Sequence, residues 1–228
     1  MIAEAYDYDW PRAEKEFRRA LELNPDYATA HQWYAECLSW QGRFNEALAE
    51  SERARQLDPL SLIIAADQGE IYLRARQYDR ALAQARTILQ MDPNFGSGRD
   101  LMDVSLMQEG RFTEALDFLD ATDSIDTRLW YWVHRAYLYT HWGRTAEAQH
   151  AQAKLQELLP KSGPQRVLAL LLAYGNTDQK DKVITLLEEA FAQHSFNFAG
   201  LKVNPEYDPL RSDPRFQDLL RRAGLAQR

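Results

Sequence analysis

The sequence predicts an all-α fold built from a stack of similar helical hairpins. Three prolines spaced 34 residues apart, Pro25, Pro59 and Pro93, close the segments Leu-Asn-Pro, Leu-Asp-Pro and Met-Asp-Pro. Small and aromatic residues recur in the same register. A fixed period of this length is typical of proteins in which each structural unit packs on the next. Such a fold favours binding over catalysis as the function.

Each recurring position has a physical role in the predicted hairpin. Small residues let the two helices of a unit approach closely, and an aromatic residue fills the gap to the next unit. The small positions hold Ala13, Ala47, Ala81 and Ala115, and then Ala20, Ala54 and Ile88; the aromatic position holds Trp10, Phe44, Tyr78 and Phe112. Gly42 and Gly110 share a position that suits a turn with positive φ, and Arg76 stands between them. Because each proline ends a helix, the unit reads helix, tight turn, helix, proline loop.

This pattern resembles the tetratricopeptide repeat, which has mid-unit small residues, a glycine before the second helix, an aromatic after it and a proline near the end. The resemblance implies a right-handed α-solenoid of helix hairpins over about residues 1–194. We expect a partial first repeat at 1–25 and further repeats at 28–60, 62–94, 96–121, 129–161 and 165–194. The unit at 129–161 carries a phase slip of one residue, and the last is degraded, with Asp178 and Val183 where glycine and alanine are usual.

The first repeat is predicted to be incomplete. Trp10–Pro25 reads as a second helix, and only Met1–Tyr8 precede it as a partner. An unpaired repeat leaves an apolar face uncovered. We therefore expect the sequence to be a piece of a longer protein; the alternative is that this face docks on another domain or on a second copy.

Residues 195–228 are predicted to form a C-terminal cap over the last repeat. Asp213 suits an N-cap with Pro214 at the first helical position, and Gly224 ends the helix. The run Asp208–Phe216 is similar to tails that end the repeat regions of bacterial winged-helix transcriptional regulators and Ser/Thr-kinase-linked repeat proteins. That resemblance implies that the repeats are the partner-binding or sensory part of a larger bacterial regulatory protein.

Composition argues against nucleic-acid and membrane binding. The net charge is −7 and the sequence has no block rich in lysine and arginine, whereas nucleic-acid binding depends on neutralising phosphates. No window approaches the roughly 18 apolar residues of a membrane span, and Met1–Glu4 show no signal peptide. The lone Cys37 excludes an intramolecular disulfide. We predict a cytoplasmic location.

The sequence offers no arrangement that predicts catalysis. His134 and His141 are seven residues apart, which is about 10 Å along a helix and too far to share one metal ion. Cys37 has no histidine at a spacing that suggests a catalytic pair. We therefore predict no enzyme activity, no cofactor and no metal.

The predicted binding surface is a groove lined by the first helices of the hairpins. Residues at turn spacing are Gln32, Trp33, Glu36, Trp40, Asp67, Glu70, Arg74, Asp100, Trp130, His134, Tyr137 and His141, with Thr29, Ile63, Ser97, Leu101, Val104 and Val133 between them. The N-terminal half is acidic and the C-terminal half is rich in aromatic and imidazole groups. Aromatic anchors often dominate an interface, and the acidic half suits a neutral or basic extended segment. The alternative is that the acids only keep the protein soluble.

Some members of the repeat family bind a peptide's C-terminal carboxylate with lysine, asparagine and arginine. At the matching positions this chain has Gln32, Glu36, Asp67, Ser97 and Leu101 or, one unit later, Ala66, Glu70, Leu101, Trp130 and His134. Neither set supplies the cations that a carboxylate requires, so we predict no recognition of acidic chaperone tails.

Taken together, the sequence predicts a non-catalytic module for protein–protein interaction. Two alternatives stay open. The first is a scaffold that forms a homodimer through the uncovered N-terminal repeat face. The second is a small-molecule sensor with a pocket near Trp130, Tyr137 and His141.

Overall fold

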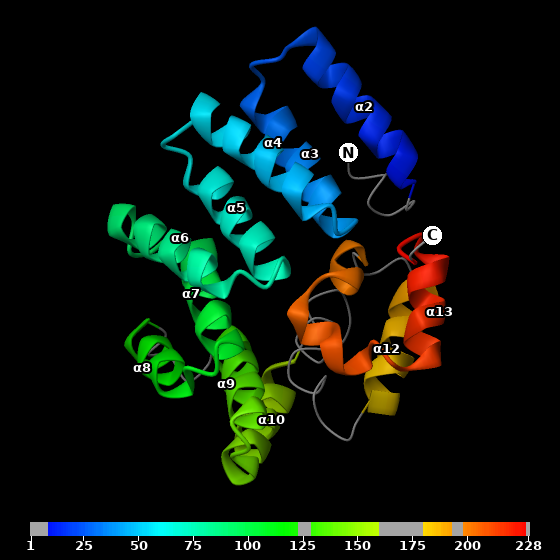
Figure 1. Cartoon of the computed structure of the whole chain (residues 1–228). Coiled ribbons are helices and arrows are strands. Elements are labelled where there is room, and N and C mark those ends of the chain that lie inside the picture. The colour runs from blue at the N-terminus through cyan, green and yellow to red at the C-terminus, as the bar shows by residue number, and fades with distance from the viewer. Residues whose placement is uncertain (1–8, 123–128, 160–179, 193–197, 227–228) are drawn as a thin grey trace. The chain divides into compact units, whose positions relative to one another are not determined.

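The computed structural model describes residues 9–122, 129–159, 180–192 and 198–226, and every element in these ranges is helical (Figure 1). The α-helices are α2 (Trp10–Leu23), α3 (Ala28–Trp40), α4 (Phe44–Leu57), α5 (Leu62–Arg74), α6 (Tyr78–Met91), α7 (Gly96–Gln108), α8 (Phe112–Thr122), α9 (Leu129–His141), α10 (Thr145–Leu158), α12 (Lys180–Ala192) and α13 (Pro214–Arg222). The 3-10 helices η1 (Ala199–Lys202) and η2 (Pro205–Leu210) precede α13. The all-α prediction is confirmed. Of the helices in these ranges, none has the length and apolar character needed to cross a membrane.

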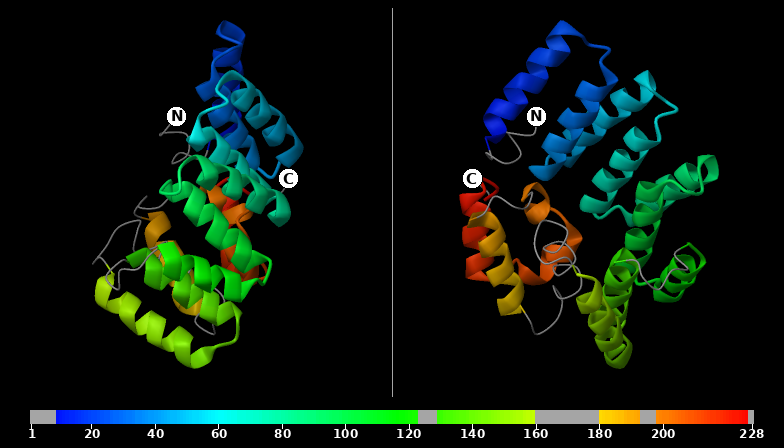
Figure 2. Two further views of the ribbon diagram at one scale, coloured as in Figure 1. Left: turned by 90° about the vertical axis from the view of Figure 1, so that its left-hand side faces the viewer. Right: turned by 180° about the vertical axis from the view of Figure 1, so that it is seen from behind.

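The hairpins keep the register of the sequence. α3 and α5 have 13 residues each, and their starts at positions 28 and 62 are 34 residues apart (62 − 28 = 34). α4 and α6 have 14 residues each and start at 44 and 78, again 34 apart (78 − 44 = 34). α9 starts at 129, which is 33 residues after the start of α7 at 96 (129 − 96 = 33), so the phase slip is confirmed. α3 packs on α2, α4 and α5, and α5 packs on α6, as the two views of Figure 2 also show.

Turns between the two helices of a hairpin use a left-handed residue. Gly42 and Gly110 have φ of 83° and 72°, which confirms the conformation predicted for this position. Arg76 occupies the same position with φ of 63°, a region that residues other than glycine rarely adopt. The main-chain N–H groups of Arg43 and Gln77, one residue after the turn, bond back to the carbonyls of Leu38 and Tyr72.

The recurring small residues form the packed centre of the hairpins. Ala47, Ala81 and Ala115 have no exposed surface, and Ala54 and Ile88 have none either. Because these side chains are short, neighbouring helices approach closely, as the sequence predicts. Tyr34, Ala35, Leu38, Ala47 and Ile71 form one core cluster, against which Phe17, Leu21, Phe44 and Leu48 pack.

The residue contacts divide the chain into two units. The first unit comprises residues up to Ser105 together with Ala199–Pro205 and the residues from Leu220 onward. The second comprises Leu106–Phe198 and Glu206–Leu219. The predicted repeat boundaries lie partly outside the described residues, as do Met1–Tyr8, Asp178 and most of the 120–128 linker.

In the second unit, α9 packs on α8 and α10. An ion pair connects the start of α13 to α12. Phe216 and Leu219 on α13 are fully buried, and Arg215 pairs with Asp181 on α12 at 2.6 Å. Asp213 accepts the main-chain N–H of Arg215 at 2.9 Å, and Pro214 opens the helix, which confirms the predicted N-cap of this helix. Gly224 has φ of 67° just after the helix, also as predicted.

Candidate functional site

The structure joins the predicted groove residues of α3 and α5 by hydrogen bonds. Gln32 Nε2 donates to Asp67 Oδ2 at 2.6 Å. One turn further along α3 and two turns further along α5, Arg74 Nη1 donates to the two carboxylate oxygens of Glu36 at 3.0 and 2.8 Å. The same nitrogen donates to Ser39 Oγ at 2.9 Å. These bonds fix the spacing of the two helices. We call the surface made of Gln32, Trp33, Glu36, Ile63, Asp67, Glu70 and Arg74 the α3–α5 wall.

Two carboxyl groups of the wall, those of Glu36 and Asp67, have pKa values above their ordinary values. Burial raises the pKa of Glu36, although the nearby Arg74 charge opposes the rise. Burial also raises the pKa of Asp67, against the hydrogen bond from Gln32. The Arg74 side chain is only 11% exposed and also lies 3.7 Å from Glu70. Glu36 is therefore paired with Arg74 inside the wall and does not contribute to an acidic surface. Of the other predicted acidic residues, Glu70 is half-buried and Asp100 on α7 is exposed.

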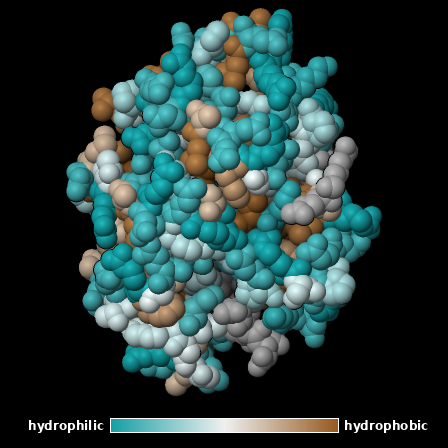
Figure 3. Space-filling model, viewed as in Figure 1, coloured by the Kyte–Doolittle hydropathy of each residue, from teal (hydrophilic) through white to brown (hydrophobic). Residues whose placement is uncertain are grey.

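Two large apolar side chains of the wall face solvent. Trp33 is 37% exposed and Ile63 is 48% exposed. Trp33 follows Gln32 in the chain, and Ile63 lies one turn before Asp67 on the same face of α5. Trp33 and Ile63 therefore lie on the two helices that the Gln32–Asp67 bond joins. The molecular face in Figure 3 is mostly hydrophilic with small, separate hydrophobic patches.

Trp40, at the end of α3, packs inward. Its ring meets the ring of Trp10 edge-to-face, with 6.3 Å between the centroids. Trp10 is buried and Trp40 is half-buried. The structure thus ties this predicted groove residue to α2.

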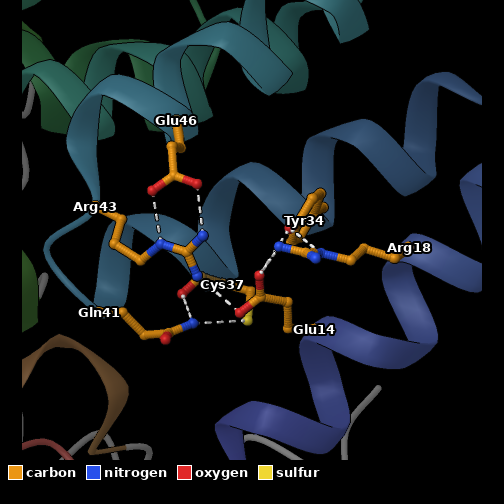
Figure 4. A network of polar contacts seen from close by, with 7 residues as sticks. All are labelled: Glu14, Arg18, Tyr34, Cys37, Gln41, Arg43 and Glu46. Carbon is orange, nitrogen blue, oxygen red and sulfur yellow. Dashed lines mark hydrogen bonds and ion pairs between the residues drawn. The ribbon is translucent and has the colours of Figure 1, made fainter.

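A polar network holds α2 against α3 and the turn into α4 (Figure 4). Arg43 Nη1 donates to Glu14 at 2.7 Å, and its Nε and Nη2 atoms donate to Glu46 at 2.8 and 2.5 Å. The Tyr34 hydroxyl donates to Glu14 at 3.1 Å and accepts from Arg18 Nε at 3.1 Å. Beside them, Gln41 Nε2 donates to the carbonyl of the buried Cys37 at 3.1 Å. The α3–α5 wall is therefore braced from the α2 side.

The predicted groove residues of the second unit form a short aromatic row on α9. The rings of Tyr137 and His141 stack with 3.9 Å between centroids, and those of Trp130 and His134 lie 6.5 Å apart. His141 Nδ1 donates to the Tyr137 carbonyl at 2.9 Å. Burial lowers the pKa of His141, against that hydrogen bond, so the neutral imidazole is favoured. Tyr137 and His134 are buried, and Trp130 and His141 are half-buried.

Two residues that bond to the predicted set were missed by the sequence interpretation. Ser39 accepts from Arg74, and the side chain of Gln108 donates to the Tyr137 hydroxyl. Gln108 stands 34 residues after Arg74, at the same position of the repeat (108 − 74 = 34). The register could therefore have identified it. In the parts of the chain that the structure describes, no three histidine, cysteine or carboxylate side chains gather as metal ligands do.

Helical hairpins in a constant register, with polar and aromatic side chains on their first helices, define an α-helical repeat protein. Residues 6–66 match the sequence model of the tetratricopeptide repeat. The matched segment is a tetratricopeptide repeat region, and the hairpins that follow it in the described residues keep the same register and fold.

Known proteins show the same likeness. Hsp70-Hsp90 organizing protein 1 of Glycine max and Hsp70-Hsp90 organizing protein 2 of Arabidopsis thaliana are 32% and 28% identical to this chain over 85 residues. The match covers 37% of this chain and spans only 15% of the length of each relative. The solved structure of Pseudomonas aeruginosa PilF has a TM-score of 0.58 at 14% identity, and the match covers 93% of both chains. That likeness is one of fold.

Proposed function

We propose that the protein is a non-catalytic interaction module whose α3–α5 wall binds an extended segment of a partner protein. The observation that carries the proposal is that Trp33 and Ile63, two large apolar side chains, are exposed on the two helices that the Gln32–Asp67 bond joins. Large aromatic anchors on a rigid surface contribute strongly to binding. The bonds between α3 and α5 hold this surface in place before a partner arrives, which lowers the entropic cost of binding. The curated relatives, named for organizing Hsp70 and Hsp90, are consistent with an interaction role.

The charges of the wall favour a neutral or basic partner segment. Asp67 and Glu70 contribute carboxylates, and the guanidinium of Arg74 is engaged by Glu36 and Ser39. A partner's carboxylate would have to compete with Glu36 for that arginine. A lysine or arginine of the partner, in contrast, finds complementary charge at the edge of the wall.

The aromatic row on α9 is proposed as a further contact surface. Trp130 and His141 keep exposed surface, whereas His134 and Tyr137 are buried beneath them and hold them in place. Trp130 and His141 are therefore the residues of this row that a partner would touch.

A selection from a random peptide library displayed on phage, with the full chain as bait, tests the wall. We expect enriched peptides that combine apolar residues with lysine or arginine. The enriched peptides should bind Trp33→Ala and Ile63→Ala on the order of tenfold more weakly, as anchor residues do. Leu60→Ala is the matched control, because Leu60 is 76% exposed but lies in the loop before α5. Equal weakening in the control, or enrichment of peptides with acidic C-termini, would contradict the proposal.

A role as the partner-binding part of a larger bacterial regulatory protein is a finer proposal. It is supported by the resemblance of the run Asp208–Phe216 to the tails of such regulators. The complete gene product tests it: an attached winged-helix or kinase domain would support this role, and an unrelated neighbouring domain would contradict it. A cytoplasmic location belongs to the same proposal.

A further inference from the structure

Two segments near the C-terminus pack on the hairpins of the first unit. Residues 199–205 and 220–226, which we call the C-terminal strap, belong to that unit, and η1 contacts α3. Leu201 and Ala223 have no exposed surface, and Val203 and Leu225 are 5% and 2% exposed. A cap over the last repeat, as predicted from the sequence, does not explain why these two segments pack on the first unit.

Hydrogen bonds between the strap and the hairpins involve main-chain carbonyls. The indole N–H of Trp10 donates to the Ala223 carbonyl at 3.4 Å. The Arg76 guanidinium donates to the Val203 carbonyl at 2.7 Å. In the other direction, the Lys202 ammonium donates to the Gln41 carbonyl at 2.9 Å, in the turn that ends α3. This ammonium is partly buried, and burial lowers the pKa of Lys202. Recognition of main-chain carbonyls by side-chain donors depends little on the side chains of the segment that is bound.

Arg76 shows that its turn is adapted to the strap. It occupies the position at which neighbouring hairpins have Gly42 and Gly110, and its φ of 63° is unfavourable for an arginine. Glycine would suit the backbone better but could not reach Val203. The Arg76 guanidinium also donates to the Arg74 carbonyl at 2.8 Å, so it joins the end of α5 to the strap.

We propose that the first hairpins carry a docking site, that its occupant is the chain's own C-terminal strap, and that the docked strap holds α2 on α3. Trp10 is the link, because it donates to Ala223 and packs on Trp40. Release of the strap would uncover the indole of Trp10 at the start of α2, where it packs on Trp40. The strap thus contacts α3, the helix that contributes Gln32, Trp33 and Glu36 to the wall, and we call its role in holding α2 there a latch. This inference is independent of which partner the wall binds.

Hydrogen exchange of the full chain, followed by mass spectrometry, tests the latch at Arg76. We expect strap amides to exchange on the order of tenfold faster in both Arg76→Gly and Arg76→Ala, since each loses a charge-assisted hydrogen bond. In Arg76→Gly the amides of α5 and α6 should stay as protected as in the wild type, because glycine relieves the turn. Arg86→Ala, an exposed arginine of α6, is the control. Unchanged exchange of the strap in both Arg76 variants would overturn the proposal.

A second pair of variants tests whether the strap holds α2. Leu225→Asp should detach residues 220–226, and Trp10→Phe removes only the indole N–H and should have a smaller effect in the same direction. In both we expect faster exchange in α2, with α5 and α6 unchanged. If α2 stays fully protected while residues 220–226 exchange freely, the strap does not hold α2 and the proposal fails. Trp10→Phe keeps the test decisive even where Leu225→Asp fails to fold.

Discussion

Arg74 on α5 holds the carboxylate of Glu36 on α3 at 3.0 and 2.8 Å, with both side chains almost enclosed by the hairpins. A buried ion pair of this kind adds little net stability compared with apolar side chains of similar size, because both charges lose their hydration. The ion pair instead fixes the spacing of α3 and α5. The two charges are satisfied only when α3 and α5 lie at one spacing, and that spacing sets the positions of Trp33 and Ile63.

The pair predicts a non-additive response to mutation. Arg74→Met leaves the Glu36 charge buried without its partner and should lower the free energy of unfolding by about 3 kcal/mol at pH 7. The second change, Glu36→Leu, should recover most of this loss. A double-mutant cycle by urea denaturation measures the coupling.

The pH dependence of Arg74→Met provides a check. Burial raises the pKa of Glu36, and loss of Arg74 removes the charge that opposes this rise. A carboxyl group with a raised pKa favours folding when protonated, and this contribution is lost as the pH rises through its folded pKa. The defect of Arg74→Met should therefore shrink as the pH is lowered. Additive single changes, or a defect that grows in acid, would contradict the role given to the pair.

Glu14 predicts the opposite pH dependence. Burial alone would raise its pKa, but the hydrogen bond and charge of Arg43, with Tyr34 and Arg18, outweigh burial and place the pKa below the ordinary 4.5. A depressed pKa means that the ionised form stabilises the fold above the ordinary value, and the benefit is lost as the pH falls through the folded pKa. Glu14→Gln should be less stable by about 1 kcal/mol at pH 7 and close to the wild type near pH 3. Urea unfolding at both pH values, with the exposed Glu16→Gln as control, measures this. A pH-independent difference would rule out the ionised network as its cause.

Two glycines at the start of α7 should respond oppositely to alanine. A Cβ on Gly98 would lie 2.7 Å from Ile88 Cγ2, and Ile88 is fully buried on α6. Gly98→Ala should therefore cost about 1 to 2 kcal/mol through overpacking. A Cβ on Gly96 would meet nothing within 4 Å, so Gly96→Ala should be neutral or stabilising by up to about 1 kcal/mol. Thermal unfolding of both variants checks the pair, and equal effects would show that helix propensity alone acts at these positions.

Most of the fold was predictable because the period is repeated in the chain. The prolines fix the helix ends, the alanines fix the close contacts, and Gly42 fixes the turn, so each local preference agrees with the stack. The bonds across the wall were not predicted, although the register contains them. Glu36 and Arg74 are 38 residues apart, one unit plus about one turn, and Gln32 and Asp67 are 35 apart. The groove positions were interpreted one by one, as charges that face a partner or solvent, and their pairing across helices was overlooked.

The strap could not be predicted by the same reasoning. Trp10 and Ala223 are 213 residues apart, and Arg76 and Val203 are 127 apart, so no periodic pattern relates them. The one local signal is Arg76 itself, an arginine at a position where neighbouring units have glycine. A break in a repeat pattern can therefore mark a contact made outside the repeat.

The small residues of the repeat predict a sharp difference between neighbouring positions of α6. Ala81 has no exposed surface at the contact between helices, whereas Ala83 is exposed on the same helix. Ala81→Ile should destabilise the chain by about 2 kcal/mol, because the added methylenes force the helices of the hairpin apart. Ala83→Ile introduces the same helix propensity cost and should stay within about 0.5 kcal/mol of the wild type. Urea unfolding of the two variants isolates the packing contribution. If both variants unfold at the same urea concentration, the recurring alanines are not set by close helix approach, and the physical basis of the register would have to be sought elsewhere.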